Sequence, residues 1–289
     1  MSAAPPVVAV IGAGTMGHGI AYAAALAGCP VRLTDQSAEQ LSRATQLIHR
    51  AFDKAIEKGK CTAAARDAAL VRLATARTPD ECAAGAAIVI EAIPERLELK
   101  QQLFASLERT VSDDTLLASN TSSLSIGAIA EPLRRPERAL GMHFFNPVPV
   151  MKLLEIVRGA ATSDDAVARA GAFASLLGKE AIVVRDTPGF ATSRLGVVLG
   201  PEAIRMLEQG VASAADIDRA MELGYNHPMG PLRLTDVVGL DVRLAIAEHL
   251  HRTFGEDTYR PPQLLRDKVA RGELGKKSGQ GFYRWETER

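Results

Sequence analysis

Cysteine is scarce in this chain, and the few that occur form no recognisable pattern. Among 289 residues only Cys29, Cys61 and Cys82 are found, and they show neither a CxxC pair nor the spacing of zinc ligands. Three thiols cannot complete a disulfide framework within one chain, which disfavours a small disulfide-stapled secreted fold. We therefore expect the three cysteines to be reduced and no metal to be bound.

Long apolar runs and an excess of one charge are also missing. No stretch reaches the ~18 consecutive apolar residues that a membrane span requires. The first residues, MSAAPPVVAV, lack the basic segment that precedes the apolar part of a signal peptide. With 34 basic and 34 acidic side chains the formal charge is zero, so no global field favours nucleic acid or an anionic membrane. We expect a cytoplasmic protein that binds neither.

What the chain does contain is an alternation of strand-like and helix-like segments. Its length and its 47% hydrophobic content fit one large or two smaller domains. Short apolar, β-branched runs occupy residues 7–12, 31–34, 87–92, 116–119, 139–144, 153–157 and 182–184. A charged, Ala-rich helical excursion covers about 39–73, and other helices lie between several strands. This alternation predicts a Rossmann-like, doubly wound, mostly parallel α/β sheet.

The pattern changes near Pro188. Beyond it only helical periodicities occur, at residues 191–209, 214–223, 240–251 and 263–271. Because a proline disfavours helix at the residue before it, Thr187 is a natural boundary. We predict a nucleotide-binding domain over 1–187 and an all-α domain over 188–289.

A glycine fingerprint follows the first predicted strand and opens a helix at Thr15 and Met16. Gly12 permits a tight turn, Gly14 lets the backbone approach a pyrophosphate, and Gly17 allows close packing of helix on strand. The N-terminus of the helix favours the phosphate charge. A glycine-rich structural turn is the alternative interpretation, and the strand-turn-helix context argues against it.

An acidic residue stands where such a fold needs one. Asp35 ends the second predicted strand, 23 positions after Gly12. A carboxylate there accepts hydrogen bonds from the adenosine ribose hydroxyls and repels a 2′-phosphate. The sequence therefore predicts NAD rather than NADP as the cofactor.

A histidine and a glutamate lie twelve positions apart in GMHFFNPVPVMKLLEIVRG. His143 alone is typical of a histidine at a strand end, and Glu155 alone of a solvated strand residue. Each lies on a predicted strand, however, and the turn at 146–149 can bring the two strands side by side. An imidazole oriented by a carboxylate is a suitable base for removing an alcohol proton during hydride transfer. From spacing alone, the catalytic and structural interpretations are evenly balanced.

Several motifs together resemble a known family. The runs VIGAGTMGHGIA, ASNTSSLSI, GMHFFNPVPVMKLLEIVRG, TPGF, HPMGP and GKKSGQGFY extend over the whole chain. They are similar to the 3-hydroxyacyl-CoA dehydrogenase family, in particular to its bacterial 3-hydroxybutyryl-CoA dehydrogenases. The resemblance implies reversible, NAD-dependent oxidation of an (S)-3-hydroxyacyl-CoA, expected to be short-chain, by a homodimer formed through the helical domain.

The resemblance also implies roles for individual residues. His143 matches the family's proton acceptor and Glu155 the glutamate that orients it. Ser122 matches a serine that hydrogen-bonds the reacting oxygen, and Asn120 an asparagine near the nicotinamide. The segment 120–122 has a structural alternative, because it follows a predicted strand and could cap a turn or the next helix.

Three further residues are expected near the cofactor or the coenzyme A ester. Glu95 and Lys100, in EAIPERLELK, match positions that line the cofactor cleft, although Glu95 could instead be a first-turn helix acid. Arg50, Lys54 and Lys58 recur at helical spacing, and the family uses basic residues of this excursion for coenzyme A, with Lys54 the best match. A solvated helix face is the alternative. The run at 275–279 is expected to be a structural tail.

One position departs from the family pattern. After the PGF motif the family places an asparagine before an arginine, but here Ser193 precedes Arg194. That asparagine contacts the substrate, and a serine hydroxyl has a shorter reach than a carboxamide. We expect Ser193 in a widened substrate pocket.

Two competing functions were weighed against this one. The β-hydroxyacid dehydrogenases also join a Rossmann domain to a helical one, but they use an interdomain lysine, and this chain has none between Lys179 and Lys268. A catalytically silent, NADH-binding structural or sensor homologue is the second alternative. Loss of the base, the carboxylate or the serine would indicate it, and all three residues are present.

Overall fold

A computed structural model describes residues 4–286. The chain divides into two compact units, with the division between Thr187 and Pro188. The two units are described separately below.

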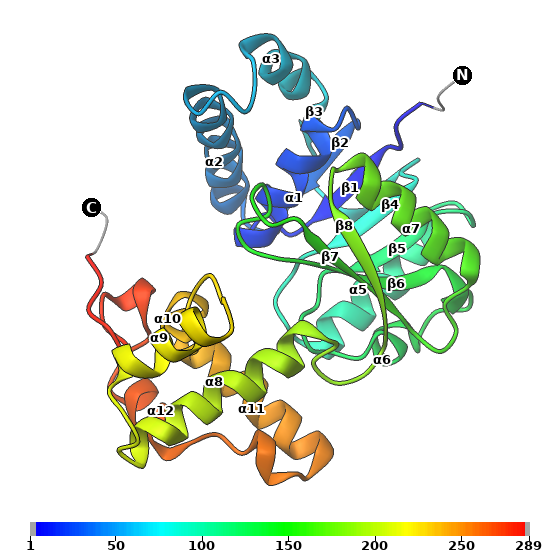
Figure 1. Ribbon diagram of the computed structural model, residues 1–289. Coiled ribbons are helices and arrows are strands. Elements are labelled where there is room, and N and C mark those ends of the chain that lie inside the picture. The colour runs from blue at the N-terminus through cyan, green and yellow to red at the C-terminus, as the bar shows by residue number, and fades with distance from the viewer. Residues whose placement is uncertain (1–3, 287–289) are drawn as a thin grey trace. The chain divides into compact units, whose positions relative to one another are not determined.

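The first unit is built on an eight-stranded sheet with the order β3-β2-β1-β4-β5-β6-β7-β8 (Figure 1). Its strands are β1 (Val8–Ile11), β2 (Val31–Thr34), β3 (Leu73–Thr75), β4 (Ile88–Glu91), β5 (Leu116–Ser119), β6 (Ala139–Phe144), β7 (Leu153–Arg158) and β8 (Glu180–Arg185). Neighbouring strands pair in parallel except β6 and β7, which are antiparallel. The predicted doubly wound, mostly parallel fold is confirmed.

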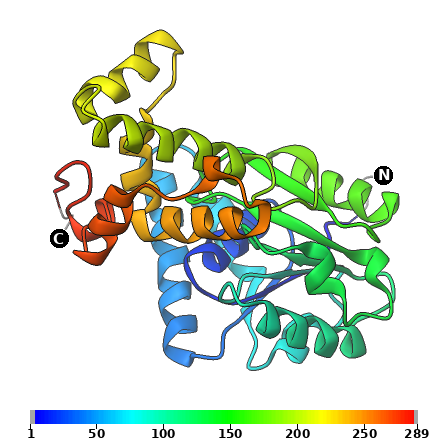
Figure 2. The ribbon, with the colours of Figure 1, turned by 90° about the horizontal axis from the view of Figure 1, so that it is seen from below.

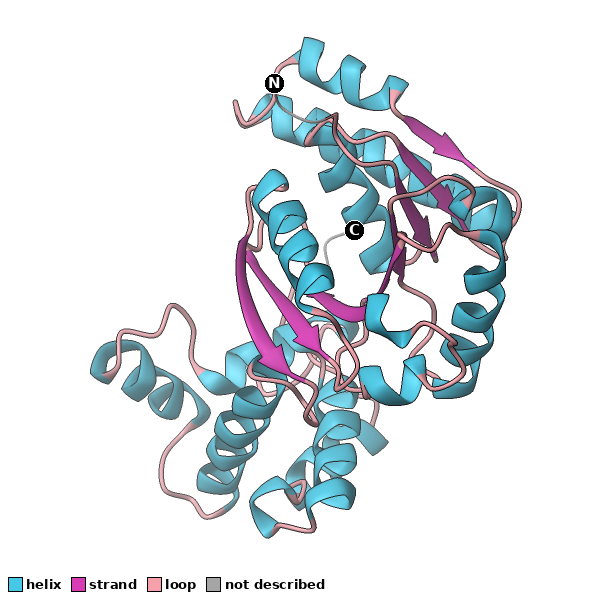
Figure 3. Cartoon of the chain, turned by 90° about the vertical axis from the view of Figure 1, so that its right-hand side faces the viewer, coloured by secondary structure: helices cyan, strands magenta, loops and turns pink. Residues whose placement is uncertain are grey.

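Helices cover the two faces of this sheet (Figure 3). They are α1 (Thr15–Leu26), α2 (Ala38–Glu57), α3 (Ala63–Val71), α4 (Pro79–Ala83), α5 (Leu97–Thr110), α6 (Ile126–Ala130) and α7 (Asp164–Leu176), with a 3₁₀ turn η1 (Pro136–Arg138). Alternate strand residues such as Val10, Ile90 and Met142 share one apolar cluster with α1, α2 and α7. A period of two places these side chains on the same face.

The helical excursion differs from its prediction. It is two helices rather than one, because the chain turns at Gly59, whose φ is +65°. It ends in strand β3, where the sequence predicted helix up to Leu73. Only three residues long and mostly exposed, β3 carries no apolar alternation from which it could have been recognised.

The second unit is helical over the residues described. It contains α8 (Thr192–Glu208), α9 (Ala214–Gly224), α10 (Pro231–Val238), α11 (Leu240–Phe254) and α12 (Gln263–Ala270), with 3₁₀ turns η2 (Asp257–Tyr259) and η3 (Lys276–Ser278). Helix α10 was not predicted. It is eight residues long, starts on a proline and is followed directly by α11, so it offers little periodicity of its own.

Two buried aspartates fasten the end of the chain to this helical unit. The carboxylate of Asp236 accepts hydrogen bonds from the backbone amides of Phe282 and Tyr283 and from Nε1 of Trp285. The hydroxyl of Tyr283 donates to Asp218 at 2.6 Å. These contacts support the prediction that the GKKSGQGFY run is a structural tail.

Candidate active site

The carboxyl ends of the central strands lie at one edge of the sheet. Ile11, the last residue of β1, is in register with Thr34 of β2 and Glu91 of β4, and Glu91 is in register with Ser119 of β5. The loops that follow these strands therefore meet. In open α/β sheets this edge, at the point where the strand order reverses, is where ligands bind.

The glycine fingerprint forms the first of these loops. Gly12 has φ +101°, and a Cβ there would lie 2.5 Å from the carbonyl oxygen of Ala92. A Cβ at Gly17 would lie 1.7 Å from the oxygen of Gly12, whereas one at Gly14 would meet nothing within 4 Å. Gly12 and Gly17 thus serve packing, and Gly14 leaves space above the loop. Helix α1 begins at Thr15, and no side chain caps it.

This geometry fits the pyrophosphate of a dinucleotide. The first-turn amides of α1, which include those of Thr15 and Met16, have no side-chain acceptor at the N-cap, so an incoming phosphate can take that place. Thr15 is exposed at the loop, while Met16 is partly buried against the core.

Asp35 is placed beside the same loop and has a second role that sequence reasoning missed. Its Oδ2 accepts a hydrogen bond from the Ala13 amide at 2.7 Å, and its Oδ1 accepts one from the Ser37 amide at 2.9 Å. Gln40 donates to the Ala13 carbonyl. The carboxylate therefore fixes the glycine loop, and each oxygen retains a lone pair for a ribose hydroxyl.

His143 and Glu155 face each other directly across the antiparallel strands β6 and β7. His143 Nδ1 lies 2.7 Å from Glu155 Oε2, and the two residues are 7% and 0% exposed. Because a carboxylate can only accept, Nδ1 carries the proton and Nε2 is the basic nitrogen. The ring of Phe145 lies 4.4 Å from the imidazole, centroid to centroid, and adds an apolar wall. A charge-assisted bond is strong in such surroundings.

The Asn120 to Ser123 loop is organised around Glu95. Glu95 Oε1 accepts from the Thr121 hydroxyl at 2.6 Å, from the Ser122 amide at 2.9 Å and from the Ser123 amide at 3.2 Å. Burial opposes the ionised form, but Lys100 and these donors outweigh it and lower the pKa of Glu95. Glu95 is thus an ionised anchor for the loop that carries Ser122.

The structural alternatives for these residues do not describe what they do. Helix α6 is capped by Ser125, whose hydroxyl accepts from the Ala128 amide, and not by the 120–122 segment. Helix α5 begins at Leu97, and its first-turn acid is Glu98 rather than Glu95. The loop and its carboxylate are therefore available for a role at the sheet edge.

Lys100 requires a correction. Its side chain is 1% exposed, so it does not line an open cleft as expected. Its Nζ lies 2.6 Å from Glu91 Oε1 and 3.2 Å from Glu95 Oε2, and Glu91 also accepts from the Ser119 hydroxyl at 2.6 Å. Lys100 therefore holds Glu95 in place from beneath the loop. Sequence reasoning missed Glu91, and the signal was a carboxylate closing the apolar strand IVIE.

Asn120 connects the loop to the strand that bears the histidine. Its Oδ1 accepts a hydrogen bond from the Phe144 amide at 2.9 Å. This bond ties the end of β5 to β6 one residue beyond His143. Asn120 lies at the sheet edge as predicted, and its amide nitrogen is the part left to face a ligand.

The predicted coenzyme A and substrate residues lie elsewhere. Arg50, Lys54 and Lys58 are all exposed, and none forms an ion pair with another residue of the described chain. Arg50 and Lys54 lie in α2, while Lys58 is the residue that ends it. Ser193 is in the first turn of α8, in the second unit, and is half-buried.

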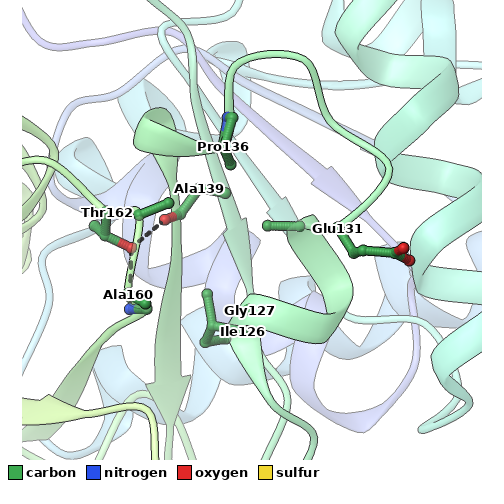
Figure 4. A pocket seen from close by; sticks show the side chains of 10 residues that line it. Ile126, Gly127, Glu131, Pro136, Ala139, Ala160 and Thr162 are labelled. Carbon is green, nitrogen blue, oxygen red and sulfur yellow. Dashed lines mark hydrogen bonds between the residues drawn. The ribbon is translucent and has the colours of Figure 1, made fainter.

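A separate hollow in the first unit does not belong to this site (Figure 4). Ala139 lines it at the start of β6, whereas His143 lies near the end of that strand. Thr162 donates to the Ala139 carbonyl at 2.6 Å and closes one side. Glu131 is the one charged residue of its lining, so the hollow offers no set of converging polar groups.

Two general observations concern residues 4–286 as a whole. No group of three or more histidine, cysteine, aspartate or glutamate side chains gathers there as metal ligands would. None of the helices there combines the length and the apolar character that a bilayer crossing needs.

A glycine loop with a ribose-binding acid and an imidazole–carboxylate pair at the same sheet edge define a dinucleotide-dependent dehydrogenase. Family models narrow the class. Residues 7–187 match the 3-hydroxyacyl-CoA dehydrogenase NAD binding domain, and residues 189–285 match the C-terminal domain of the same family. The chain belongs to the 3-hydroxyacyl-CoA dehydrogenase family, and it is an oxidoreductase that uses NAD.

Individual relatives agree over nearly the full length. A probable 3-hydroxybutyryl-CoA dehydrogenase of Bacillus subtilis is 46% identical over 97% of this chain and 98% of its own. The 3-hydroxybutyryl-CoA dehydrogenase of Mycobacterium tuberculosis is 44% identical over 98% and 99%. The crystal structure of (S)-3-hydroxybutyryl-CoA dehydrogenase from Ralstonia eutropha superposes with a TM-score of 0.93, at 41% identity over 98% of this chain and 99% of that one.

Proposed function

We propose that this enzyme interconverts a short-chain (S)-3-hydroxyacyl-CoA, 3-hydroxybutyryl-CoA in the first instance, and the 3-ketoacyl-CoA. The observation that carries the proposal is the 2.7 Å contact between His143 Nδ1 and Glu155 Oε2 at the carboxyl edge of the sheet. The names of the relatives supply the substrate class.

The chemistry of the site follows from the tautomer. His143 Nε2 accepts the proton of the substrate hydroxyl as the carbinol hydrogen leaves as hydride, which bound NAD accepts. The imidazolium that forms is stabilised by Glu155, which is buried and cannot exchange its partner for water. In the reverse direction the imidazolium returns the proton to the oxygen of the ketone.

Ser122 is proposed to hydrogen-bond the reacting oxygen. Its amide is held by Glu95, and its hydroxyl lies 3.5 Å from the same carboxylate, close enough to be oriented by it and long enough to exchange it for a ligand. Glu95 and Lys100 act as positioning residues for this loop. Lys54, on the exposed face of α2, is proposed to bind a phosphate of coenzyme A, and Ser193 to line the acyl pocket.

A homodimer through the helical unit is part of the proposal. Helices α8, α10 and α11 pack on one another, and each exposes large apolar side chains. These are Leu195, Leu199, Leu234, Val237, Val238 and Val242. An exposed apolar set of this kind on a soluble protein favours burial against a partner, and the resemblance indicates a second copy of the chain.

A spectrophotometric assay tests the proposal directly. NADH oxidation is followed with acetoacetyl-CoA and with longer 3-ketoacyl-CoA esters, in parallel with NADH binding measured by fluorescence. We expect turnover that is highest for the four-carbon ester. NADH binding without turnover of any ester would refute the proposal and support the silent homologue.

A further inference from the structure

Arg243, on α11, is a buried charge to which the structure gives no counter-ion. The residue is 5% exposed, and its Nε has no hydrogen-bond partner. Within residues 4–286 no carboxylate lies within ion-pair distance of its guanidinium. Burial lowers its pKa to about 10, so the group is still charged at neutral pH.

Carboxylates on the neighbouring helices are engaged by other groups. Asp241, two residues before Arg243 in α11, pairs with Lys277 at 2.6 Å. Asp236 of α10 accepts from three donors of the C-terminal tail, and Asp218 of α9 accepts from two backbone amides and a tyrosine hydroxyl. The positive charge of Arg243 therefore has no acid of its own unit left to neutralise it.

Two glycines of α8 make room for this side chain. A Cβ at Gly196 would lie 2.7 Å from Nη1 of Arg243, and a Cβ at Gly200 would lie 3.4 Å from its Nε. The guanidinium thus lies along α8, with its far end toward Gly196, where α8 and α11 run side by side (Figure 2). Ser193 precedes Gly196 by three residues and so lies on the same side of the helix.

An arrangement of this kind suits a ligand that brings its own negative charge. Burying a guanidinium without a partner is costly, and an anion that binds beside it recovers that cost. The planar fork of arginine matches a carboxylate through two parallel hydrogen bonds. A carboxylate also fits the narrow space beside two glycines better than a tetrahedral phosphate does.

We propose that Arg243 binds a carboxylate at the far end of the acyl chain, so that the enzyme accepts CoA thioesters of dicarboxylic 3-hydroxy acids. The inference rests on the proposed function for the placement of Ser193 in the acyl pocket. It adds a specificity-determining cation, reached through the gap that Gly196 and Gly200 leave in α8.

The test compares two six-carbon 3-ketoacyl-CoA esters, one ending in a carboxylate and one in a methyl group. The wild-type enzyme is expected to turn over the carboxylated ester with at least the kcat/KM of the other. Arg243→Met should lower kcat/KM for the carboxylated ester by about 10- to 100-fold, mainly through KM, as expected for a lost charge-assisted bond. The loss for the methyl-terminated ester should stay below about 3-fold.

A second variant keeps the charge and moves it. In Gly196→Ala the added methyl group would displace the end of the guanidinium, so we expect a smaller loss of the same selectivity. Gly171→Ala, in α7, is the matched control, because a Cβ there meets nothing within 4 Å and the site is in the first unit. Gly196→Ala decides the question if Arg243→Met does not fold.

Three outcomes would overturn the inference. They are a wild-type enzyme that does not turn over the carboxylated ester, equal losses on both esters in the variants, and an Arg243→Met effect confined to dimer dissociation, which would assign the counter-ion to a second copy. Acetoacetyl-CoA turnover is measured alongside. Its absence in the wild type would mean that the proposed function has failed, whereas its persistence would confine the failure to Arg243.

Discussion

The two units bury cations in opposite ways. In the sheet unit, Lys100 lies between Glu91 and Glu95, and every charge of the set has a partner within 3.2 Å. In the helical unit, Arg243 is nearly as deeply buried and has no carboxylate beside it. The first arrangement is complete without a ligand and fixes the position of a loop. The second is incomplete, and this difference separates a scaffold from a binding group.

The largest effect is expected at the paired base of the sheet unit. His143→Ala should cut turnover of acetoacetyl-CoA by about 10²-fold or more, because no other group holds a proton acceptor at this position. NADH affinity should stay near that of the wild type, since the glycine loop is untouched. Stopped-flow turnover and NADH fluorescence titration measure the two quantities. Turnover near the wild-type value would assign the proton to a different acceptor.

Stability should separate the two buried cations. Lys100→Met leaves Glu91 buried and uncompensated, which we expect to cost about 3–5 kcal/mol. For a unit of this size that lowers the melting temperature by about 6–15 °C. Arg243→Met removes an unpaired charge, so its melting temperature should be unchanged or higher. Circular dichroism melts of both variants check the contrast, and equal destabilisation would contradict it.

The apolar helices of the second unit give the next effect. Leu199→Glu places a charge on the exposed face of α8 and should shift the enzyme from dimer toward monomer. Analytical ultracentrifugation measures the shift. Val71→Glu is the control, because Val71 is equally apolar and exposed but lies on α3 in the first unit. A wild-type enzyme that sediments as a monomer would contradict the proposed assembly.

The smallest effect is expected at Ser193. Ser193→Asn restores the side chain that the family pattern has there, and we expect kcat/KM to change by a few-fold, more for longer acyl chains than for acetoacetyl-CoA. Ser193→Ala is the companion variant, because it removes the hydroxyl without adding bulk. If neither variant alters kinetics at any chain length, the residue is not in the pocket and the acyl placement assumed for Arg243 loses its support.

Local patterns were sufficient for much of the sheet unit. The apolar runs predicted β5 and β6 with their observed bounds, and the glycines and Asp35 were placed correctly at the first crossover. Strand β3 and helix α10 were missed because each is too short for its periodicity to be visible. Lys100 was assigned to the cleft because spacing along a helix does not reveal which face is buried.

The sequence by itself determined the fold class, the division near Pro188, the NAD fingerprint and the pairing of His143 with Glu155, because each follows from periodicity or from residues close along the chain. Only the tertiary structure decided what surrounds a charge. Glu91, Lys100 and Glu95 meet because strands β4 and β5 end side by side, and Arg243 lacks a carboxylate because the nearby aspartates bind elsewhere. Burial and charge pairing are properties of the whole fold, so no short pattern in the sequence encodes them.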